Sequence, residues 1–98
     1  MTAIPPTVTL PAPSFAPTDY ERLSEHGRGV VGQAFRYVMH LGALVEAGKA
    51  LPPAYEDASQ RRAWLRLAKK APLHERGAIR GMLADAMGAA HAIRQGVR

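Results

Sequence analysis

The sequence contains no cysteine, so it offers neither a disulfide nor a thiolate ligand for a metal ion. No stretch of about eighteen residues is apolar throughout, which argues against a membrane-spanning helix. The N-terminus also lacks the basic region and the unbroken apolar region of a secretory signal. We therefore expect a protein of the cytoplasm, or of a particle that assembles inside the cell.

Charge is missing from residues 1–17, which hold five prolines but no ionisable side chain. Proline removes backbone donors and fixes φ, so this segment is predicted to form an extended arm that does not fold alone. Within it, Thr7–Leu10 alternates like a strand, which would suit addition to the edge of a partner's sheet. The arm carries apolar side chains that a solvated linker does not need. We predict that they bind a partner: Ile4, Val8, Leu10 and Phe15.

Residues 18–98 are predicted to form the folded body. They leave about 80 residues for a core, which is near the lower limit for independent stability. Their apolar positions recur with helical spacing, and no strand pattern competes with it. The predicted fold is therefore all-α: a small three-helix bundle that gains part of its burial from an oligomer or a partner.

The first predicted helix covers about residues 19–47. Thr18 and Glu21 have the spacing of a capping box, which places Thr18 at the N-cap. Apolar positions keep their phase across Gly27–Gly29, so two alternatives remain. Either one long helix continues through the glycines, with or without a kink, or a short and a long helix meet there nearly end to end. Gly48 is predicted to end the helix.

The second helix is predicted over residues 58–71, with Asp57 or Ser59 as its N-cap and Trp64 facing the core. The third is predicted over residues 73–96. Its apolar stripe follows the spacing of one helix face: Ile79, Met82, Leu83, Ala86, Ala90, Ile93 and Val97.

The far side of the third helix is rich in small residues, which would let another backbone approach closely. Two interpretations remain open, because this face can either pack within the bundle or bind a partner. The small residues are Gly77, Gly81, Ala84, Gly88, Ala89, Ala92 and Gly96. From this set we predict Gly81, Gly88 and Ala92 as partner-binding residues.

The net charge of +5 arises in the second half, where nine basic residues from Ala54 onward face four acidic ones. Such an excess favours an anionic partner, and nucleic acid is the alternative functional prediction. The pattern lacks residues at base-reading spacing, and a solvated helix face has the same composition. The candidate phosphate contacts are Arg61, Arg62, Arg66, Lys69, Lys70, Arg76, Arg80, Arg94 and Arg98.

Catalytic and cofactor signatures are weak throughout. His26, Gln33 and His40 align at heptad spacing, but a metal site would need a third ligand from another helix. The glycines of Gly27–Gly32 follow no strand and lack a Lys-Ser/Thr pair, so they do not predict a phosphate loop. No serine has the context of an activated nucleophile. We expect no enzyme activity, no metal and no cofactor.

The sequence therefore predicts a non-catalytic helical binding protein. It would be an assembly subunit, an adaptor or an inhibitor that docks on a larger complex, and its partner would be another protein or further copies of itself. Peripheral membrane binding through the basic faces is a weaker alternative, because Trp64 is predicted to face the core. The abundance of Ala, Arg and Gly is typical of a GC-rich bacterial or phage genome.

Overall fold

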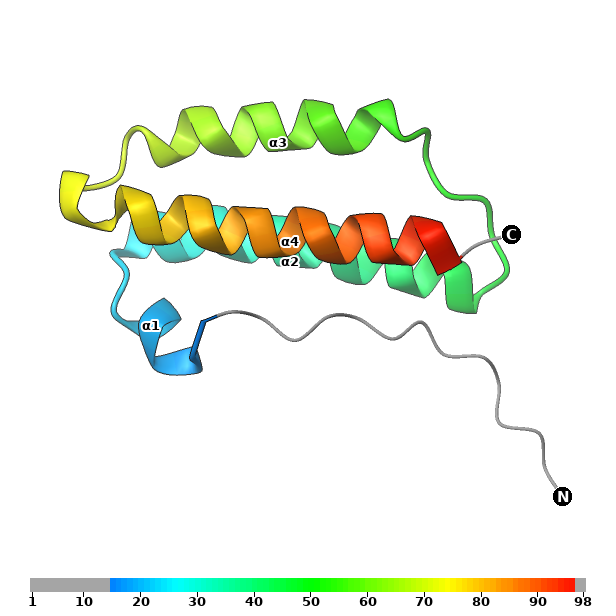
Figure 1. The fold of residues 1–98 in the computed structure, drawn as a ribbon, viewed down its shortest axis with the longest axis horizontal. Helices are drawn as coiled ribbons and strands as arrows, with labels where there is room; N and C mark the ends of the chain where they lie inside the picture. The colour runs from blue at the N-terminus through cyan, green and yellow to red at the C-terminus, as the bar shows by residue number, and fades with distance from the viewer. Residues whose placement is uncertain (1–14, 97–98) are drawn as a thin grey trace, which may run out of the picture.

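The computed structural model describes residues 15–96. Its elements are α1 (Pro17–Glu21), α2 (Glu25–Glu46), α3 (Tyr55–Ala68), the short 3₁₀ turn η1 (Leu73–Glu75) and α4 (Arg76–Gly96). In Figure 1, α2 and α4 run in the same direction, α3 returns in the opposite direction on one side of them, and α1 lies on the other side near the start of α2. The predicted all-α three-helix bundle is confirmed, with one additional short helix. Of the predicted arm, residues 1–14 lie outside the described residues.

The first predicted helix is two helices, and the break falls before the glycines. The prediction of a kink or junction at Gly27–Gly29 is wrong, because the helix ends after Glu21 and α2 begins at Glu25. Ser24 caps α2, and its Oγ accepts a hydrogen bond from the Gly27 backbone N–H at 3.1 Å. A serine that can satisfy the backbone donors of the next helix is enough to divide the segment, although the apolar phase continues across it.

Other predicted helix caps also need correction. Thr18 is not an N-cap: α1 starts two residues earlier than predicted, with Ala16 at the N-cap and the Ala16 N–H donating to the Asp19 carboxylate at 2.9 Å. At the end of α2, the prediction for Gly48 is confirmed. Its φ of +67° lies in the left-handed region that glycine adopts without a steric penalty.

The second predicted helix is shifted toward the N-terminus. Neither Asp57 nor Ser59 caps α3, since Ala54 occupies the N-cap and makes no side-chain hydrogen bond there. The helix ends at Ala68 instead of residue 71, and Pro72 leads into η1. The carboxylate of Asp57 is not available for capping, because it is bound by two side chains of other helices.

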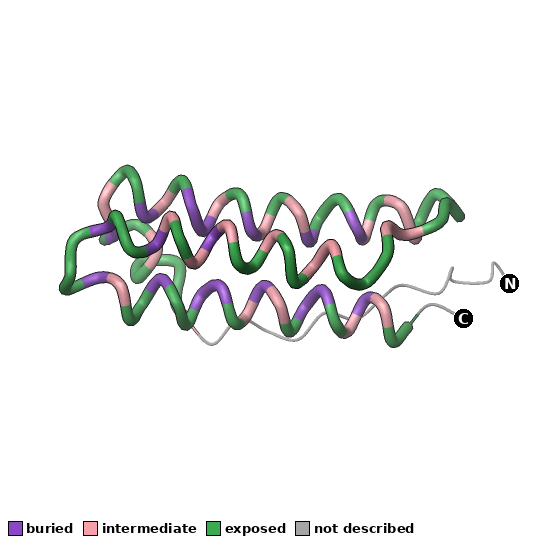
Figure 2. The backbone as a smooth tube through the Cα atoms, turned by 90° about the horizontal axis from the view of Figure 1, so that it is seen from above, coloured by how far each residue is buried: buried purple, intermediate pink, exposed green. Residues whose placement is uncertain are grey.

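The core lies between α2, α3 and α4, where the three inner faces meet. Figure 2 shows the buried residues of each helix facing the other two, with exposed residues on the outside. The largest fully buried side chains are Leu41, Ile79, Leu83, Ile93, Val30 and Val31. Alanines that are 0% exposed, such as Ala34 and Ala86, let the helices approach closely. The apolar stripe predicted for α4 is confirmed as far as Ile93, and Val97 lies outside the described residues.

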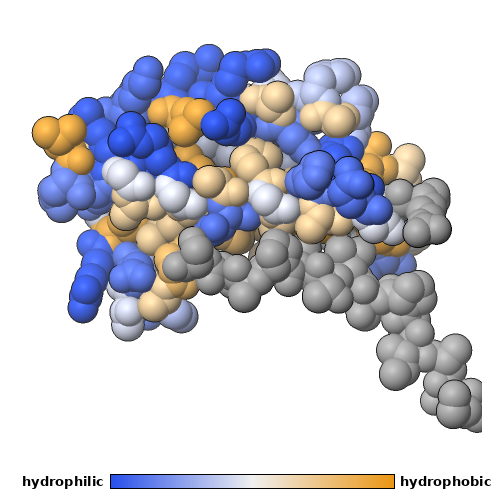
Figure 3. All heavy atoms as spheres, in the orientation of Figure 1, coloured by the Kyte–Doolittle hydropathy of each residue, from blue (hydrophilic) through white to orange (hydrophobic). Residues whose placement is uncertain are grey.

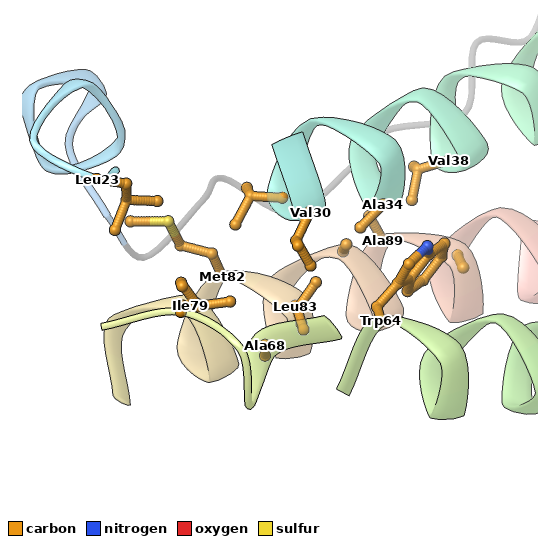
Figure 4. Close-up of a cluster of buried hydrophobic side chains, with 14 of the residues drawn as sticks. Leu23, Val30, Ala34, Val38, Trp64, Ala68, Ile79, Met82, Leu83 and Ala89 are labelled. Atoms are coloured by element: carbon orange, nitrogen blue, oxygen red, sulfur yellow. The ribbon is translucent and has the colours of Figure 1, made fainter. Parts of the chain in front are cut away.

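Trp64 occupies the centre of the contact between α3 and α2. Only 3% of its surface is exposed, and its ring meets the edge of Tyr37 with 5.6 Å between centroids. Figure 4 shows Trp64 pointing from α3 toward Ala34, Val38 and Ala89, while Leu23 closes the core beside Met82. The prediction that Trp64 faces the core is confirmed. Within residues 15–96, no helix is long and apolar enough to cross a membrane.

Candidate binding surfaces

An apolar groove runs over the outer face of α2, away from the core. Its volume is about 720 Å³. It is lined by Phe15, Pro17, Tyr20, Glu21, Val31, Gly32, Phe35, Arg36 and Met39. We refer to the hollow that these residues line as the apolar groove. Met39 is 70% exposed, whereas Phe35 is half-buried beneath Phe15. An exposed methionine beside two aromatic rings is a feature of adaptable protein-binding surfaces.

Local contacts hold α1 against α2 at one end of this groove. The Phe15 ring meets the Phe35 ring edge-on at 5.9 Å, and the Tyr20 hydroxyl donates to the Arg28 carbonyl at 3.1 Å. Arg28 in turn donates to the Leu23 carbonyl at 2.7 Å. Phe15, predicted to bind a partner, thus packs on its own bundle and stays half-buried. The other predicted anchors of the arm, Ile4, Val8 and Leu10, lie outside the described residues.

Phe15 also borders a second hollow of about 400 Å³, between α1 and the start of α4. The lining residues of this second hollow are Phe15, Asp19, Arg22, Leu23, His74, Glu75, Ala78, Gly81 and Met82. One residue of the predicted small-residue face, Gly81, therefore reaches a concave site. In Figure 3, apolar residues occur among polar ones across the middle of the molecule.

Within the described part of the chain, the outer face of α4 has open positions. A Cβ atom placed on Gly77, Gly81 or Gly88 would meet no atom of residues 15–96 within 4 Å, apart from its two chain neighbours and the helix's own nearby backbone. The interpretation that this face packs inside the bundle is therefore wrong for these three glycines. It holds for Ala89, which is only 5% exposed, while Ala92 is half-buried.

The basic residues of α3 and the start of α4 are mostly exposed. Arg61, Arg62, Arg66, Lys69, Lys70 and Arg80 are exposed and Arg76 is half-buried. Three of them converge on a hollow of about 260 Å³ between the two helices. Its lining residues are Leu65, Ala68, Lys69, Arg76 and Arg80, which we call the basic pocket. Hydrophilic residues dominate the part of the surface over α3 in Figure 3. Sequence reasoning predicted the charges but not their convergence.

Arg94, predicted as a phosphate contact, is instead bound inside the protein. Its Nε lies 2.6 Å from Asp57 Oδ2, and its terminal nitrogens donate to Asp57 Oδ1 at 2.8 Å and to the Pro52 carbonyl at 2.7 Å. The Tyr37 hydroxyl donates to the same carboxylate. These contacts join α2, α3, α4 and the loop before α3. The last predicted phosphate contact, Arg98, lies outside the described residues.

The ionisation of this cluster follows from its contacts. Hydrogen bonds from Arg94 and then Tyr37 outweigh the effect of burial and lower the pKa of Asp57. Burial, followed by the hydrogen bond to Asp57, raises the pKa of Tyr37 to about 12. The hydrogen bonds to Asp57 raise the pKa of Arg94. We call Tyr37, Asp57 and Arg94 the charged clamp. Their contacts favour the charged forms of Asp57 and Arg94 and the protonated form of Tyr37.

A second carboxylate closes the opposite end of the bundle. Glu75 is only 6% exposed and accepts hydrogen bonds from Ser24, from the backbone N–H at 2.9 Å and from Oγ at 2.7 Å. Burial acts to raise the pKa of Glu75, but the hydrogen bonds from Ser24, with the nearby charges of His74 and Arg28, lower it overall. Sequence reasoning missed this contact, because it joins residues 51 positions apart.

Gly27 provides the space for that carboxylate. A Cβ atom there would lie 2.6 Å from Glu75 Oε2 and 3.1 Å from Ile79 Cδ1. Gly29, two residues later, has nothing within 4 Å of a Cβ position. Gly27 and Gly29 therefore differ. Only at Gly27 would a side chain collide with a neighbouring residue among those described.

Metal-ligating residues do not converge within residues 15–96, where no group of three or more His, Asp or Glu side chains could hold an ion. His26 Nε2 lies 2.7 Å from the Leu67 carbonyl, and His40 is exposed on the outside of α2. The structure does not bring them together with a third ligand, which the metal alternative required.

The chain has no match among protein-family models, curated proteins or solved structures. Arguments about function therefore depend on the surfaces described above.

Proposed function

We propose that this protein is a non-catalytic helical adaptor or assembly subunit that binds another protein through the apolar groove. The observation that carries the proposal is the groove itself, in which Met39 on α2 is 70% exposed beside the half-buried ring of Phe35. A single exposed apolar side chain is common on protein surfaces. An apolar hollow of about 720 Å³ is less common and supports a site of interaction.

The position of Phe15 supports the same function. Phe15 is a predicted anchor of the arm, and it lines the groove and packs on Phe35. A partner that covers Met39 would therefore be near Phe15 as well. The proposed occupant is an apolar segment of the partner protein, because the lining of the groove is predominantly apolar.

The open glycine face of α4 extends the proposed contact. Glycine in a helix costs about 1 kcal/mol relative to alanine, and Gly77, Gly81 and Gly88 gain no packing within the described bundle. Because Gly81 also lines the second hollow beside Phe15, a partner in the apolar groove could reach this face around α1.

The test is a quantitative pull-down from the source cell with the full chain, after nuclease treatment. Met39→Glu places a carboxylate in the groove, and His40→Glu places the same group on the adjacent exposed position outside it. We expect a protein recovered in stoichiometric amount with the wild type and with His40→Glu. With Met39→Glu its affinity should fall by about tenfold or more, because a carboxylate would have to lose its hydration in a predominantly apolar contact.

Purified components distinguish the outcomes. The recovered protein should bind directly to the wild-type chain, and sedimentation of the chain alone shows whether the partner is a second copy. Deleting residues 1–14 should weaken binding without changing the helical circular dichroism. Equal recovery with Met39→Glu and His40→Glu, or no protein recovered in stoichiometric amount, would contradict the proposal.

A further inference from the structure

The basic pocket lies on a different face from the apolar groove, at the corner where α3 ends and α4 begins. Lys69 comes from the C-terminal end of α3, while Arg76 and Arg80 come from the first two turns of α4. Leu65 and Ala68 form the apolar part of the lining. Cations from two helices thus point toward one hollow of about 260 Å³, which is room for a small anionic group.

One of these cations is held in position by the fold. Arg76 Nε donates to the Ala71 carbonyl at 2.9 Å, which anchors the guanidinium group across the turn between the helices. Its terminal nitrogens make no hydrogen bond within residues 15–96. A guanidinium that is already oriented loses less entropy when it binds an anion.

Acidic residues do not neutralise the pocket. None lines it, and the ion pairs within the described part of the chain engage Asp57 with Arg94 and Glu75 with His74. The first turn of α4 also contains no acidic residue. Glu75 directly precedes Arg76, but its carboxylate binds Ser24 and does not line the pocket, so no acidic side chain of residues 15–96 lies in the lining beside Arg76 and Arg80.

We propose that the basic pocket binds a phosphate group of a nucleic-acid backbone, in addition to the protein partner at the apolar groove. The exposed cations Arg62 and Arg66 continue outward from Lys69 along α3, at intervals of one helical turn. This row would contact neighbouring phosphates of the same strand, which gives affinity without reading the base sequence.

A lipid surface is the less favoured source of phosphate. Binding to a bilayer needs several large apolar side chains beside the charges. In the described residues, the exposed large apolar side chains are Met39, Tyr55 and Leu73, and only Leu73 lies near the basic pocket in the sequence. The pocket also lies between two helices on the side of the bundle, where a strand can enter.

The test is fluorescence anisotropy of a labelled DNA single strand and of the corresponding duplex, titrated with the full chain at several salt concentrations. Lys69→Gln/Arg80→Gln removes two charges from the pocket but keeps Arg76, whose contact with Ala71 supports the fold. The matched control, Lys49→Glu, changes the net charge by the same two units at an exposed position that lines none of the proposed surfaces, so both variants have the same net charge.

We expect wild-type binding that weakens with salt and is about tenfold weaker in the pocket variant. The magnitude of the slope of log affinity against log salt should fall by about 1.8 for the duplex and about 1.4 for the single strand, and the control should bind like the wild type. Equal weakening in both variants would overturn the proposal, because net charge alone would explain it. Absence of binding at low salt, or binding only to phosphatidylserine-containing vesicles or only to inorganic phosphate, would overturn it as well.

Discussion

Each end of the bundle is closed by a carboxylate, the buried Glu75 at one end and the half-buried Asp57 at the other, but in different ways. At one end, Glu75 accepts hydrogen bonds from neutral groups of Ser24, next to the N-terminus of α2. At the other, Asp57 is held by the Arg94 guanidinium and the Tyr37 hydroxyl. The first contact depends on helix-cap geometry and on the space at Gly27, whereas the second depends on paired charges.

The second hollow and the basic pocket lie toward the Glu75 end, whereas the apolar groove extends along α2 as far as Met39, beyond Tyr37 of the charged clamp. Arg94 and Asp57 line none of these surfaces. The charged clamp therefore joins the three long helices without lining a proposed binding surface.

The largest expected effect comes from breaking the charged clamp. Arg94→Ala removes the cation from a pair whose side chains are only 17% and 15% exposed, and it leaves the Asp57 carboxylate and the Pro52 carbonyl without it. The free energy of unfolding should fall by about 3 kcal/mol. Urea denaturation followed by circular dichroism measures this. Arg61→Ala, on the exposed side of α3, is the control and should change stability by less than about 0.5 kcal/mol.

A smaller effect is expected at the Glu75 end, where the two glycines form a matched pair. Gly27→Ala should destabilise by about 1 kcal/mol, because crowding against Glu75 and Ile79 exceeds the gain in helix propensity. Gly29→Ala should stabilise by up to about 1 kcal/mol, since nothing surrounds that position. Thermal denaturation of both variants tests the difference, and a stabilising Gly27→Ala would disprove the close fit.

The smallest expected effect is a difference between the wild type and Arg94→Ala in how the free energy of unfolding depends on pH. The pKa values of Asp57 and Glu75 are lowered from ordinary values of 3.8 and 4.5. Their stabilising contributions are therefore complete above those values and are lost as pH falls through the lowered pKa of each group. In Arg94→Ala, the loss of stability below about pH 4 should be shallower than in the wild type. Urea midpoints measured from neutral to acid pH test this, and parallel curves would contradict it.

The sequence predicts the elements that depend on local pattern. The stripe of α4 is periodic enough to give its buried face, and Gly48 marks the end of α2 because a left-handed residue is needed there. The division at Ser24 could not be predicted, because the apolar phase continues across it. The roles of Asp57 and Arg94 depend on a contact across 37 positions, so the composition of α4 made Arg94 look like one of the exposed cations.

The candidate surfaces also combine features that the sequence predicts with features that only the structure shows. The basic character of α3 and α4 is readable from the sequence, but the basic pocket requires knowing that Lys69 and Arg80 face each other across a turn. The apolar groove depends on α1 folding back onto α2, which the prediction of a continuous or nearly collinear helix did not contain. Long-range packing, rather than local propensity, creates both surfaces.

The short helix α1 contributes no fully buried residue and is joined to α2 by few contacts, among them those of Phe15 and Tyr20. Segments of this kind open at a smaller free-energy cost than the body of a bundle. Phe15 is the wall shared by the apolar groove and the second hollow. Release of α1 would remove this wall, and the two concavities would then be continuous from α2 to the start of α4.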